Sequence, residues 1–322
     1  MAIDPYVLRT EARLRARSGP VDLTDPADFR RHATEQQDIF MSVLGIETAD
    51  VATADQAVAV DGHPDTRLRI YHPTSTATPP GTGLPVFVYF YGGAFIVGDI
   101  DWPAYDAYCR RLAADSGVIV VAGEYGLAPE LTFPAQPEQC WTILDWVARH
   151  AEDFGGDPGR LGVGGASSGA NLAAVAAILN RDRGGHPLRL LACMNMCSDL
   201  TGDHLTELGT LSPIPDEELQ RGLRFAAATY LAGADPRQPT VSPLLADLHG
   251  LPTALVVTCE IDPLCGDGEA FAQALQDAEV PTTCVRFVSQ THTSGGMLGA
   301  VPAADSLQRL LASTLRDLGT PA

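Results

Sequence analysis

Residues 165–169 read G-A-S-S-G and place a serine where its hydroxyl could act as a nucleophile. In the G-x-S-x-G pattern, small flanking residues allow a sharp turn between a strand and a helix, and this turn exposes the serine side chain. The apolar segment 161–164 precedes the pentapeptide and the alanine-rich segment 170–175 follows it, as that geometry requires. We therefore predict that Ser167 is a nucleophile. The hydroxyl of Ser168 is the alternative, although its own frame would need a glycine where an alanine stands.

A serine hydroxyl is a poor nucleophile unless a base takes its proton and a carboxylate orients that base. Asp262 follows the apolar segment 253–259, and His292 comes a few residues after the next apolar segment. We predict that His292 is the base and that Asp262 is the acid that orients it. Glu260 and Asp267 are the rival carboxylates. Most of the other histidines lie beside turns or helix ends, away from the expected site.

Two consecutive glycines, Gly92 and Gly93, follow the apolar segment 85–91. Consecutive glycines can turn their backbone N–H groups toward a ligand. We predict that these N–H groups, with the N–H of Ser168 at a helix N-terminus, hold the negative oxygen that forms when a carbonyl is attacked. A flexible turn at the end of a strand is the alternative interpretation.

The elements that would position these residues alternate along the chain. Short apolar segments predict strands at 85–91, 117–122, 160–165, 189–194, 253–259 and 283–288. Segments with helical spacing lie between them, at 105–116, 139–150, 168–181, 268–278 and 303–318. This alternation predicts an α/β fold, in which helices cover both faces of a mainly parallel sheet. Residues 74–85, rich in Thr, Pro and Gly, predict a surface turn between two strands.

Two segments do not follow the alternation. The region 4–45 predicts two amphipathic helices, and the interval 198–250 is too long for a simple crossover and contains a helix near 216–231. We assign both to a lid over the strand ends, called the cap below. The predicted division is 1–46 for the N-terminal cap helices, 47–197 for the catalytic core, 198–235 for the cap insertion and 236–322 for the rest of the core.

The composition narrows the function classes. The 322 residues include 40 acidic and 21 basic ones, a formal charge of −19 that repels nucleic acids and anionic membrane surfaces. The chain contains no lysine, which excludes Schiff-base chemistry and P-loop nucleotide binding. A composition that is rich in alanine and has arginine as its only strong base suggests a bacterial source. We expect a small ester or acyl compound as substrate.

The seven cysteines are an odd number and show neither a C-x-x-C pair nor the spacing of metal ligands. We expect reduced, buried thiols and neither a metal nor another cofactor. The first twenty residues lack the apolar core of a signal peptide, and no apolar run reaches membrane-spanning length. These features predict a soluble cytoplasmic protein.

Together these motifs resemble the hormone-sensitive-lipase-like branch (family IV) of the α/β-hydrolases, a group of bacterial carboxylesterases. Further matching segments are L-A-P-E at 127–130, F-P at 133–134, S-P-L at 242–244 and D-P-L at 262–264. The resemblance implies the α/β-hydrolase fold, with a mainly parallel eight-stranded sheet and a helical cap. It also implies cleavage of carboxylic esters of short to medium acyl chains through an acyl-enzyme on Ser167. Dimerisation through the last strand is common in similar proteins.

The sequence departs from the family pattern around the expected site. Tyr91 replaces the histidine of the H-G-G-G motif and Ala94 its third glycine. Ala166 replaces the aspartate of the elbow, Gly126 the usual arginine, and Thr-Ser at 293–294 the usual Gly-Phe. Since the three catalytic positions are intact, these changes bear on substrate and rate more than on mechanism.

Two other functions use the same residues. An acyltransferase, lactonase or cyclase of a biosynthetic pathway would form the same acyl-enzyme and deliver the acyl group to an alcohol or amine, or close the substrate on itself. A non-catalytic ligand-binding member, like the plant gibberellin receptor of this branch, would lack the triad histidine, whereas His292 is present. Metal-dependent hydrolysis is disfavoured because the chain has no H-E-x-x-H motif.

Overall fold

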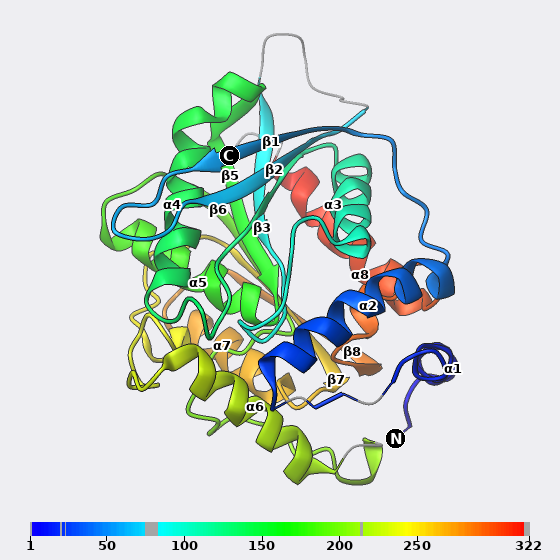
Figure 1. Cartoon of the computed structure of the whole chain (residues 1–322). Helices are drawn as coiled ribbons and strands as arrows, with labels where there is room; N and C mark the ends of the chain where they lie inside the picture. Colours follow the sequence, from blue (N-terminus) through cyan, green and yellow to red (C-terminus); the bar gives the residue numbers. More distant parts are fainter. Residues whose placement is uncertain (1, 20, 23, 75–82, 213–214, 319–322) are drawn as a thin grey trace.

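The computed structural model describes residues 2–19, 21–22, 24–74, 83–212 and 215–318 and contains one sheet of eight strands (Figure 1). The strands are β1 (Ala52–Val58), β2 (Thr66–His72), β3 (Leu84–Phe90), β4 (Ile119–Gly123), β5 (Gly156–Ala166), β6 (Leu188–Met194), β7 (Ala254–Ile261) and β8 (Thr282–Thr291). Their order in the sheet is β1-β2-β4-β3-β5-β6-β7-β8. β2 pairs antiparallel with both β1 and β4, and every other pairing is parallel.

The central strands are buried on both faces by helices. The helices are α1 (Pro5–Arg15), α2 (Pro26–Leu44), α3 (Pro103–Ser116), α4 (Ala135–His150), α5 (Ser168–Asp182), α6 (Asp216–Leu231), α7 (Cys265–Asp277) and α8 (Pro302–Asp317). α3 contacts α8 and α4 contacts α5, and Figure 1 shows these two pairs on opposite sides of β3. This cover explains why β3 and β4 are almost continuously apolar rather than alternating.

The α/β fold predicted from the sequence is confirmed. The six predicted strands correspond to β3–β8 and the predicted helices to α1–α8, with ends that differ by a few residues. β1 and β2 were not identified among the apolar segments, since β1 is an edge strand and six of its seven residues are exposed. The predicted surface turn at 74–85 lies largely outside the described residues.

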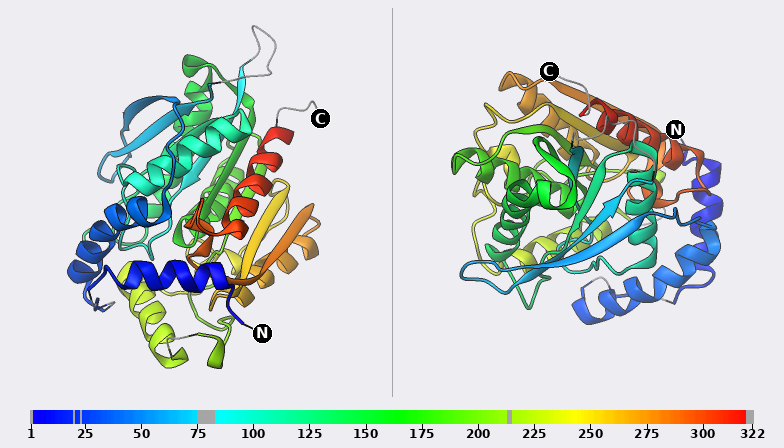
Figure 2. Two further views of the ribbon diagram at one scale, coloured as in Figure 1. Left: turned by 90° about the vertical axis from the view of Figure 1, so that its right-hand side faces the viewer. Right: turned by 90° about the horizontal axis from the view of Figure 1, so that it is seen from above.

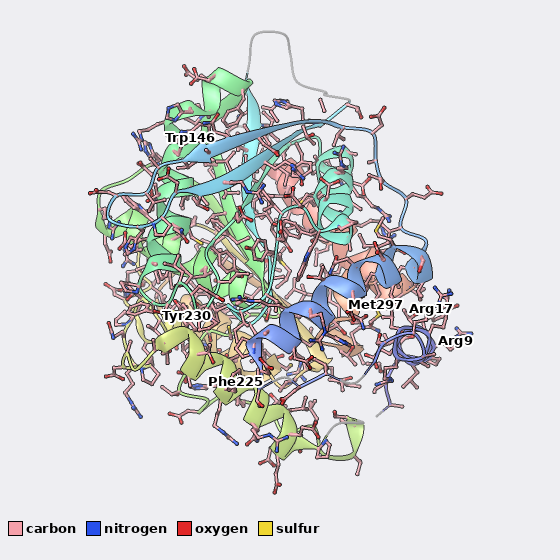
Figure 3. All side chains as sticks on the ribbon, viewed as in Figure 1. Arg9, Arg17, Trp146, Phe225, Tyr230 and Met297 are labelled. Atoms are coloured by element: carbon pink, nitrogen blue, oxygen red, sulfur yellow. The ribbon has the colours of Figure 1, made fainter. Side chains whose placement is uncertain are left out.

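Both N-terminal helices begin as their sequence predicts. Asp4 and Asp25 accept hydrogen bonds from the backbone N–H groups of Tyr6 and Ala27, and a proline occupies the first turn of each helix. α1 and α2 form a second, small apolar core with residues 297–304 of the segment after β8. Met297 belongs to this core and lies next to α2 in Figure 3.

α1, α2 and α6 lie together at one end of the sheet (Figures 1 and 2). Among the described residues, no helix is long and apolar enough to cross a membrane. The division of the chain into core and cap remains a prediction.

Candidate active site

Three residues predicted to carry chemistry each follow the end of a parallel strand. Ser167 comes directly after β5, Asp262 directly after β7 and His292 directly after β8. Because the carboxyl ends of parallel strands meet at one edge of a sheet, side chains from distant parts of the sequence converge there. The sheet thus brings together residues separated by as many as 125 positions in the chain.

The serine occupies a strained turn between β5 and α5. Its backbone angles are φ 53° and ψ −123°, outside the conformations that ordinary residues prefer, and it makes no side-chain cap on α5. Its N–H donates to the carbonyl of Met194, 2.8 Å away. A Cβ on Gly165 would lie 2.4 Å from the backbone of Gly169, and one on Gly169 would lie 2.2 Å from the carbonyl oxygen of Tyr91. Close packing therefore requires both glycines of the motif.

The imidazole of His292 bridges the serine and the aspartate. Its Nε2 lies 3.1 Å from Ser167 Oγ, and its Nδ1 lies 2.7 Å from Asp262 Oδ2. The Asp262 carboxylate is fully buried, and its other oxygen accepts the N–H of Leu264 at 2.9 Å. A carboxylate only accepts, so Nδ1 carries the proton and Nε2 is left to accept from the serine hydroxyl.

Two opposing effects act on the pKa of His292. Its burial lowers that pKa, whereas the charge of Asp262 and the hydrogen bond to it raise the pKa, and the net result lies above the ordinary histidine value. The ring therefore binds a proton more readily than a histidine in water. This is the property that a base needs when it takes a proton from a hydroxyl.

The two rival carboxylates have other partners. Glu260 Oε2 accepts the backbone N–H of Ser289 at 2.8 Å. Asp267 accepts from both the N–H and the hydroxyl of Ser198, at 2.9 and 2.7 Å, and burial raises its pKa to about 7. Within the described part of the chain, neither bonds to His292, so Asp262 is the carboxylate that the geometry selects.

The glycines predicted to hold an oxyanion lie against the serine. A Cβ on Gly92 would lie 3.0 Å from the Cβ of Ser167 and 2.7 Å from the carbonyl oxygen before it. Gly93 has φ 153°, and a Cβ there would lie 1.9 Å from the carbonyl oxygen of Val97. Among the described residues, the N–H groups of these two glycines donate to no backbone carbonyl, so they are available to a ligand. Ser168 begins α5, so the N-terminus of that helix faces the same point.

Tyr91, at the position of the family's motif histidine, supports this glycine segment from inside the core. Its ring stacks on Tyr125 with centroids 4.5 Å apart, and each hydroxyl donates to the other residue's backbone carbonyl, at 3.0 and 2.9 Å. Tyr125 Oη also lies 3.3 Å from the buried Ser168 Oγ. A Cβ on Gly98 would lie 2.0 Å from the Tyr91 ring. The substitution therefore changes the support of the loop and leaves its glycine N–H groups in place.

The two residues that follow Gly93 in the loop have left-handed backbones although neither is glycine. Ala94 has φ 54° and Phe95 has φ 63°. The buried ring of Phe95 stacks on Tyr230 of α6, with centroids 4.0 Å apart and planes 10° from parallel. This contact joins the loop to the predicted cap insertion.

An arginine of α2 holds the same loop. Arg30 donates to the carbonyls of Ile96 at 2.8 Å and Ala128 at 2.6 Å, and its guanidinium also pairs with both carboxylate oxygens of Glu130, at 2.8 and 2.5 Å. Since backbone carbonyls and a carboxylate share this one side chain, α2 is fixed to the loops that follow β3 and β4.

The sequence did not single out Arg30, Tyr230 or Asn195, whose side chain contacts the backbone of His292. One sequence feature could have identified Asn195: it directly follows the predicted strand at 189–194, just as the other site residues follow predicted strands. Arg30 and Tyr230 lie on amphipathic helices and have no comparable local signal.

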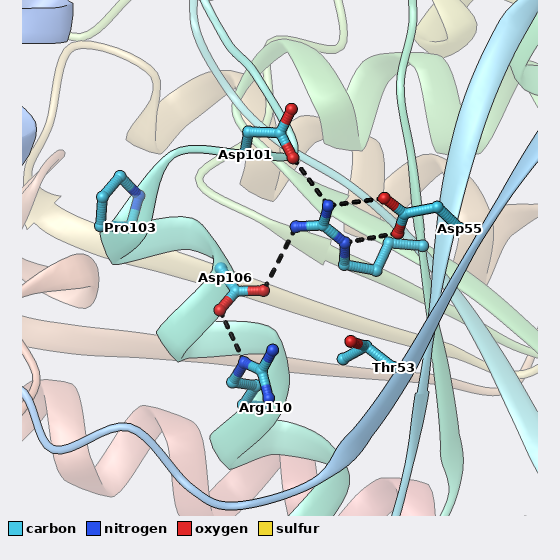
Figure 4. A pocket seen from close by; sticks show the side chains of 7 residues that line it. Thr53, Asp55, Asp101, Pro103, Asp106 and Arg110 are labelled. Atoms are coloured by element: carbon cyan, nitrogen blue, oxygen red, sulfur yellow. Dashed lines mark hydrogen bonds and ion pairs between the residues drawn. The ribbon is translucent and has the colours of Figure 1, made fainter.

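A polar hollow of about 660 Å³ lies elsewhere, between β1, β2 and α3 (Figure 4). Arg69 crosses it and bonds to Asp55 at 2.6 and 2.7 Å, to Asp101 at 2.7 Å and to Asp106 at 3.5 Å. Asp106 also accepts from Arg110 at 2.6 Å. These charges satisfy one another, so the hollow is an ion-pair network that joins strands to a helix rather than part of the catalytic edge.

Comparisons with known proteins agree with this geometry. Carboxylesterase NlhH of Mycobacterium tuberculosis is 36% identical over 272 residues, which are 82% of this chain and 82% of the relative. Esterase LipI of the same species is 34% identical and covers 73% of each chain. The solved structure of a hyperthermophilic esterase from the archaeon Pyrobaculum calidifontis superposes with a TM-score of 0.84 at 29% identity, over the full length of both chains.

The sequence pattern of a protein family described as having the alpha/beta hydrolase fold matches residues 87–295. This match spans more than half of the chain and includes the elbow, the glycine loop, the aspartate and the histidine. The chain therefore belongs to this family of α/β-hydrolases, within the hormone-sensitive-lipase-like branch that its motifs resemble.

Proposed function

We propose that the protein is a serine hydrolase that cleaves carboxylic esters, with Ser167 as nucleophile, His292 as base and Asp262 as the acid that orients the base. One observation carries the assignment: a single imidazole lies within hydrogen-bond distance of both the elbow hydroxyl and a buried carboxylate. The esterase relatives at 34–36% identity support the same reaction.

In this proposal, Ser167 Oγ attacks the ester carbonyl carbon while His292 Nε2 takes the hydroxyl proton. The carbonyl π electrons move to its oxygen, whose negative charge is held by the N–H groups of Gly92, Gly93 and Ser168. The carbonyl re-forms, the C–O bond to the alcohol breaks, and the alcohol leaves with the proton from His292. Water then repeats the sequence on the acyl-enzyme and releases the acid.

The test uses a fluorophosphonate probe and p-nitrophenyl esters of increasing acyl length on the wild-type protein and on S167A. We expect labelling and turnover, both lost in S167A. The matched control is S168A, which removes the neighbouring hydroxyl but keeps the backbone N–H, and which we expect still to be labelled. Labelling of S167A would contradict the assignment of the nucleophile.

The same assay separates the alternative outcomes. A burst of p-nitrophenol followed by very slow turnover would indicate an acyltransferase, lactonase or cyclase whose proper acceptor is missing. Neither labelling nor turnover would indicate a ligand-binding protein. The ester series also tests the prediction of short to medium acyl chains.

The pH dependence of kcat/KM follows from the raised pKa of His292. A base must be unprotonated, so activity should fall as the pH drops through that pKa, and the midpoint should lie above the ordinary value of about 6.5. D262N removes the charge that raises the pKa, so we expect kcat to fall by roughly 10³–10⁴-fold and the midpoint to move to lower pH. A midpoint that does not respond to D262N would contradict the assignment of the acid.

We also propose that residues 1–46 and 198–235 form a cap over the substrate. Three contacts support this: Arg30 bonds to the loop after Gly93, the N–H of Asp4 donates to Ser289 O at 2.9 Å, and the N–H of Thr206 donates to Pro263 O at 2.7 Å. All three fix cap segments to loops or to a strand end that lie next to site residues in the chain.

The assembly and the location of the protein are further proposals. β8 is an edge strand of the sheet with several exposed residues, among them Val288, which supports a homodimer through this edge. All seven cysteines are free thiols and six are buried, which is in keeping with a reducing cytoplasm. The mycobacterial relatives support a bacterial source.

A further inference from the structure

Asn195 occupies the junction of the three strands that carry the site. It directly follows β6, which lies between β5 and β7 in the sheet. The carbonyl of the preceding residue, Met194, accepts the N–H of Ser167, and the N–H of Asn195 donates to Val257 O of β7, both at 2.8 Å. The backbone at this point is therefore fixed to the strands that lead to the serine and to the aspartate.

The side chain of Asn195 reaches the third strand end. Its Nδ2 donates to the backbone carbonyl of His292 at 2.9 Å, and the residue is only 7% exposed. A carbonyl only accepts hydrogen bonds, so this contact fixes which end of the amide faces the histidine. The backbone of Asn195 is left-handed, with φ 46°, a conformation that asparagine tolerates better than most residues.

The other end of the amide has no comparable role. Asn195 Oδ1 is buried and has no hydrogen-bond partner among the described residues. A buried, unpaired oxygen destabilises a fold relative to an apolar group of the same size. Stability alone therefore gives little reason for an amide at this position. Its side chain also contacts the thiol of Cys259, and its hydrogen bond to a backbone carbonyl ends on the catalytic histidine.

Other hydrogen bonds hold the residues on either side of His292, in the segment 289–296. Thr291 Oγ1 donates to Glu11 Oε1 of α1 at 3.1 Å, Gln290 Nε2 donates to Asp4 Oδ2 at 3.2 Å, and Ser294 Oγ donates to Thr291 O at 2.8 Å. The two ring contacts of His292 are the hydrogen bonds of catalysis itself, and the Ser167 contact must rearrange when substrate reacts. Asn195 is thus the contact from the sheet onto the backbone of His292.

We propose that Asn195 is a positioning residue for the catalytic base. By donating to the His292 carbonyl, its amide keeps the imidazole in the position in which Nε2 reaches Ser167 while Nδ1 stays hydrogen-bonded to Asp262. The inference rests on the proposed role of His292 as base.

The test compares N195D and N195L with matched changes at Asn180. Both replacements at position 195 keep the approximate size of the side chain and remove the donor, and the ionised aspartate would also face a carbonyl. Asn180, on α5, is 4% exposed, and its Nδ2 also donates to a histidine carbonyl, that of His186, at 2.7 Å, at the far end of α5 from the serine. N180D and N180L therefore remove the same kind of donor away from the site, and N180L also removes the oxygen that accepts the N–H of His186 at 3.0 Å.

For each variant, Tm, kcat, KM and the pH profile of kcat/KM are measured on one p-nitrophenyl ester. We expect the variants at position 195 to lose about 10- to 100-fold in kcat with little change in KM, the size of effect that a small misplacement of a catalytic group produces. In N195L the acidic limb of the pH profile should move to lower pH, because a displaced ring loses part of its contact with Asp262. N195D is compared on kcat alone, since its new negative charge acts on the pKa of His292 in the opposite direction. The variants at position 180 should have a lower Tm but an unchanged kcat and an unchanged acidic limb of the pH profile.

Three results would overturn the inference. If the variants at position 195 keep the wild-type kcat and acidic limb while H292A abolishes turnover, Asn195 does not position the base and the proposed function stands. If kcat at both positions falls only in proportion to the folded fraction, the role of Asn195 is structural. Turnover retained by H292A would instead remove the proposed function, and the inference with it.

Discussion

The two loops that meet at the serine differ in what holds them. In the elbow, one residue is strained, Ser167, and the neighbouring Gly165 and Gly169 are required because a Cβ on either would collide with backbone. In the loop after β3, Gly93 is required in the same way, but two further left-handed residues, Ala94 and Phe95, have side chains. Local sterics shape the elbow, whereas distant side chains also hold the loop.

This difference explains which structural features can be recognised from the sequence. A glycine that packing requires appears as a motif, because any larger residue is excluded at that position. A strained alanine or phenylalanine looks ordinary in the sequence. Its conformation persists only because the surrounding structure enforces it, here through the Tyr91–Tyr125 pair, the Phe95–Tyr230 stack and Arg30.

The largest expected effect comes from G169A, which breaks the elbow. The new Cβ would lie 2.2 and 2.3 Å from the carbonyl oxygens of Tyr91 and Phe90, backbone atoms that no rotamer change can move. We expect a loss of about 1–3 kcal/mol in unfolding free energy from overpacking. We also expect a fall in kcat of roughly 100-fold or more because the serine moves. Urea unfolding and ester turnover measure the two effects.

G19A is the control for this experiment, since a Cβ on Gly19 would meet no atom within 4 Å. It should leave both quantities near their wild-type values. Equal effects of the two replacements would show that the elbow glycine is not required by packing.

An intermediate effect is expected from R30Q, which removes a distant support of the loop. The carbonyls of Ile96 and Ala128 lose their charged donor, at a cost of about 1–3 kcal/mol. The pair with Glu130 adds little, because that carboxylate is largely exposed. If the oxyanion N–H groups shift with the loop, kcat should fall about tenfold, which corresponds to about 1.4 kcal/mol.

R31Q is the matched control, because Arg31 is the next residue of α2 and, among the residues that the structure describes, pairs with carboxylates of the same helix. Surface changes of this kind stay within about 0.5 kcal/mol. A kcat that falls equally in R30Q and R31Q would reflect the charge of α2 rather than support of the loop.

The smallest expected effect comes from A94G, which restores the glycine of the family motif. Relief of the left-handed strain, about 1–2 kcal/mol, is largely offset by the greater freedom of glycine in the unfolded chain. We expect a net gain of about 0.5 kcal/mol in unfolding free energy, with a modest fall in kcat because the loop is less rigid. A232G, at the left-handed end of α6, should give the same gain and no change in kcat. A loss of stability in A94G would show that the alanine is not strained.

Most of the fold and the candidate site could be predicted because both follow from strand ends. β3–β8 are short apolar runs, and the predicted Ser167, Asp262 and His292 each come after one of them, so their convergence follows from parallel pairing. β1 was not predicted because it is an edge strand whose residues are mostly exposed, and β2 because Arg67 and Arg69 interrupt its apolar residues. Arg30 and Asn195 act through contacts 66 to 98 residues away in the chain, which no local pattern displays.

The small core shared by α1, α2 and residues 297–304 links the beginning of the chain to the segment just after His292. Val7 and Leu14 of α1 pack there with Met297 and Leu298. Separating α1 from the molecule would expose apolar surface of both segments to water, at a free-energy cost of about 25 cal/mol per Å². We therefore expect the N-terminal helices and the segment after His292 to open together in local unfolding. Fraying that begins at the N-terminus should then reach the base before it reaches the central strands.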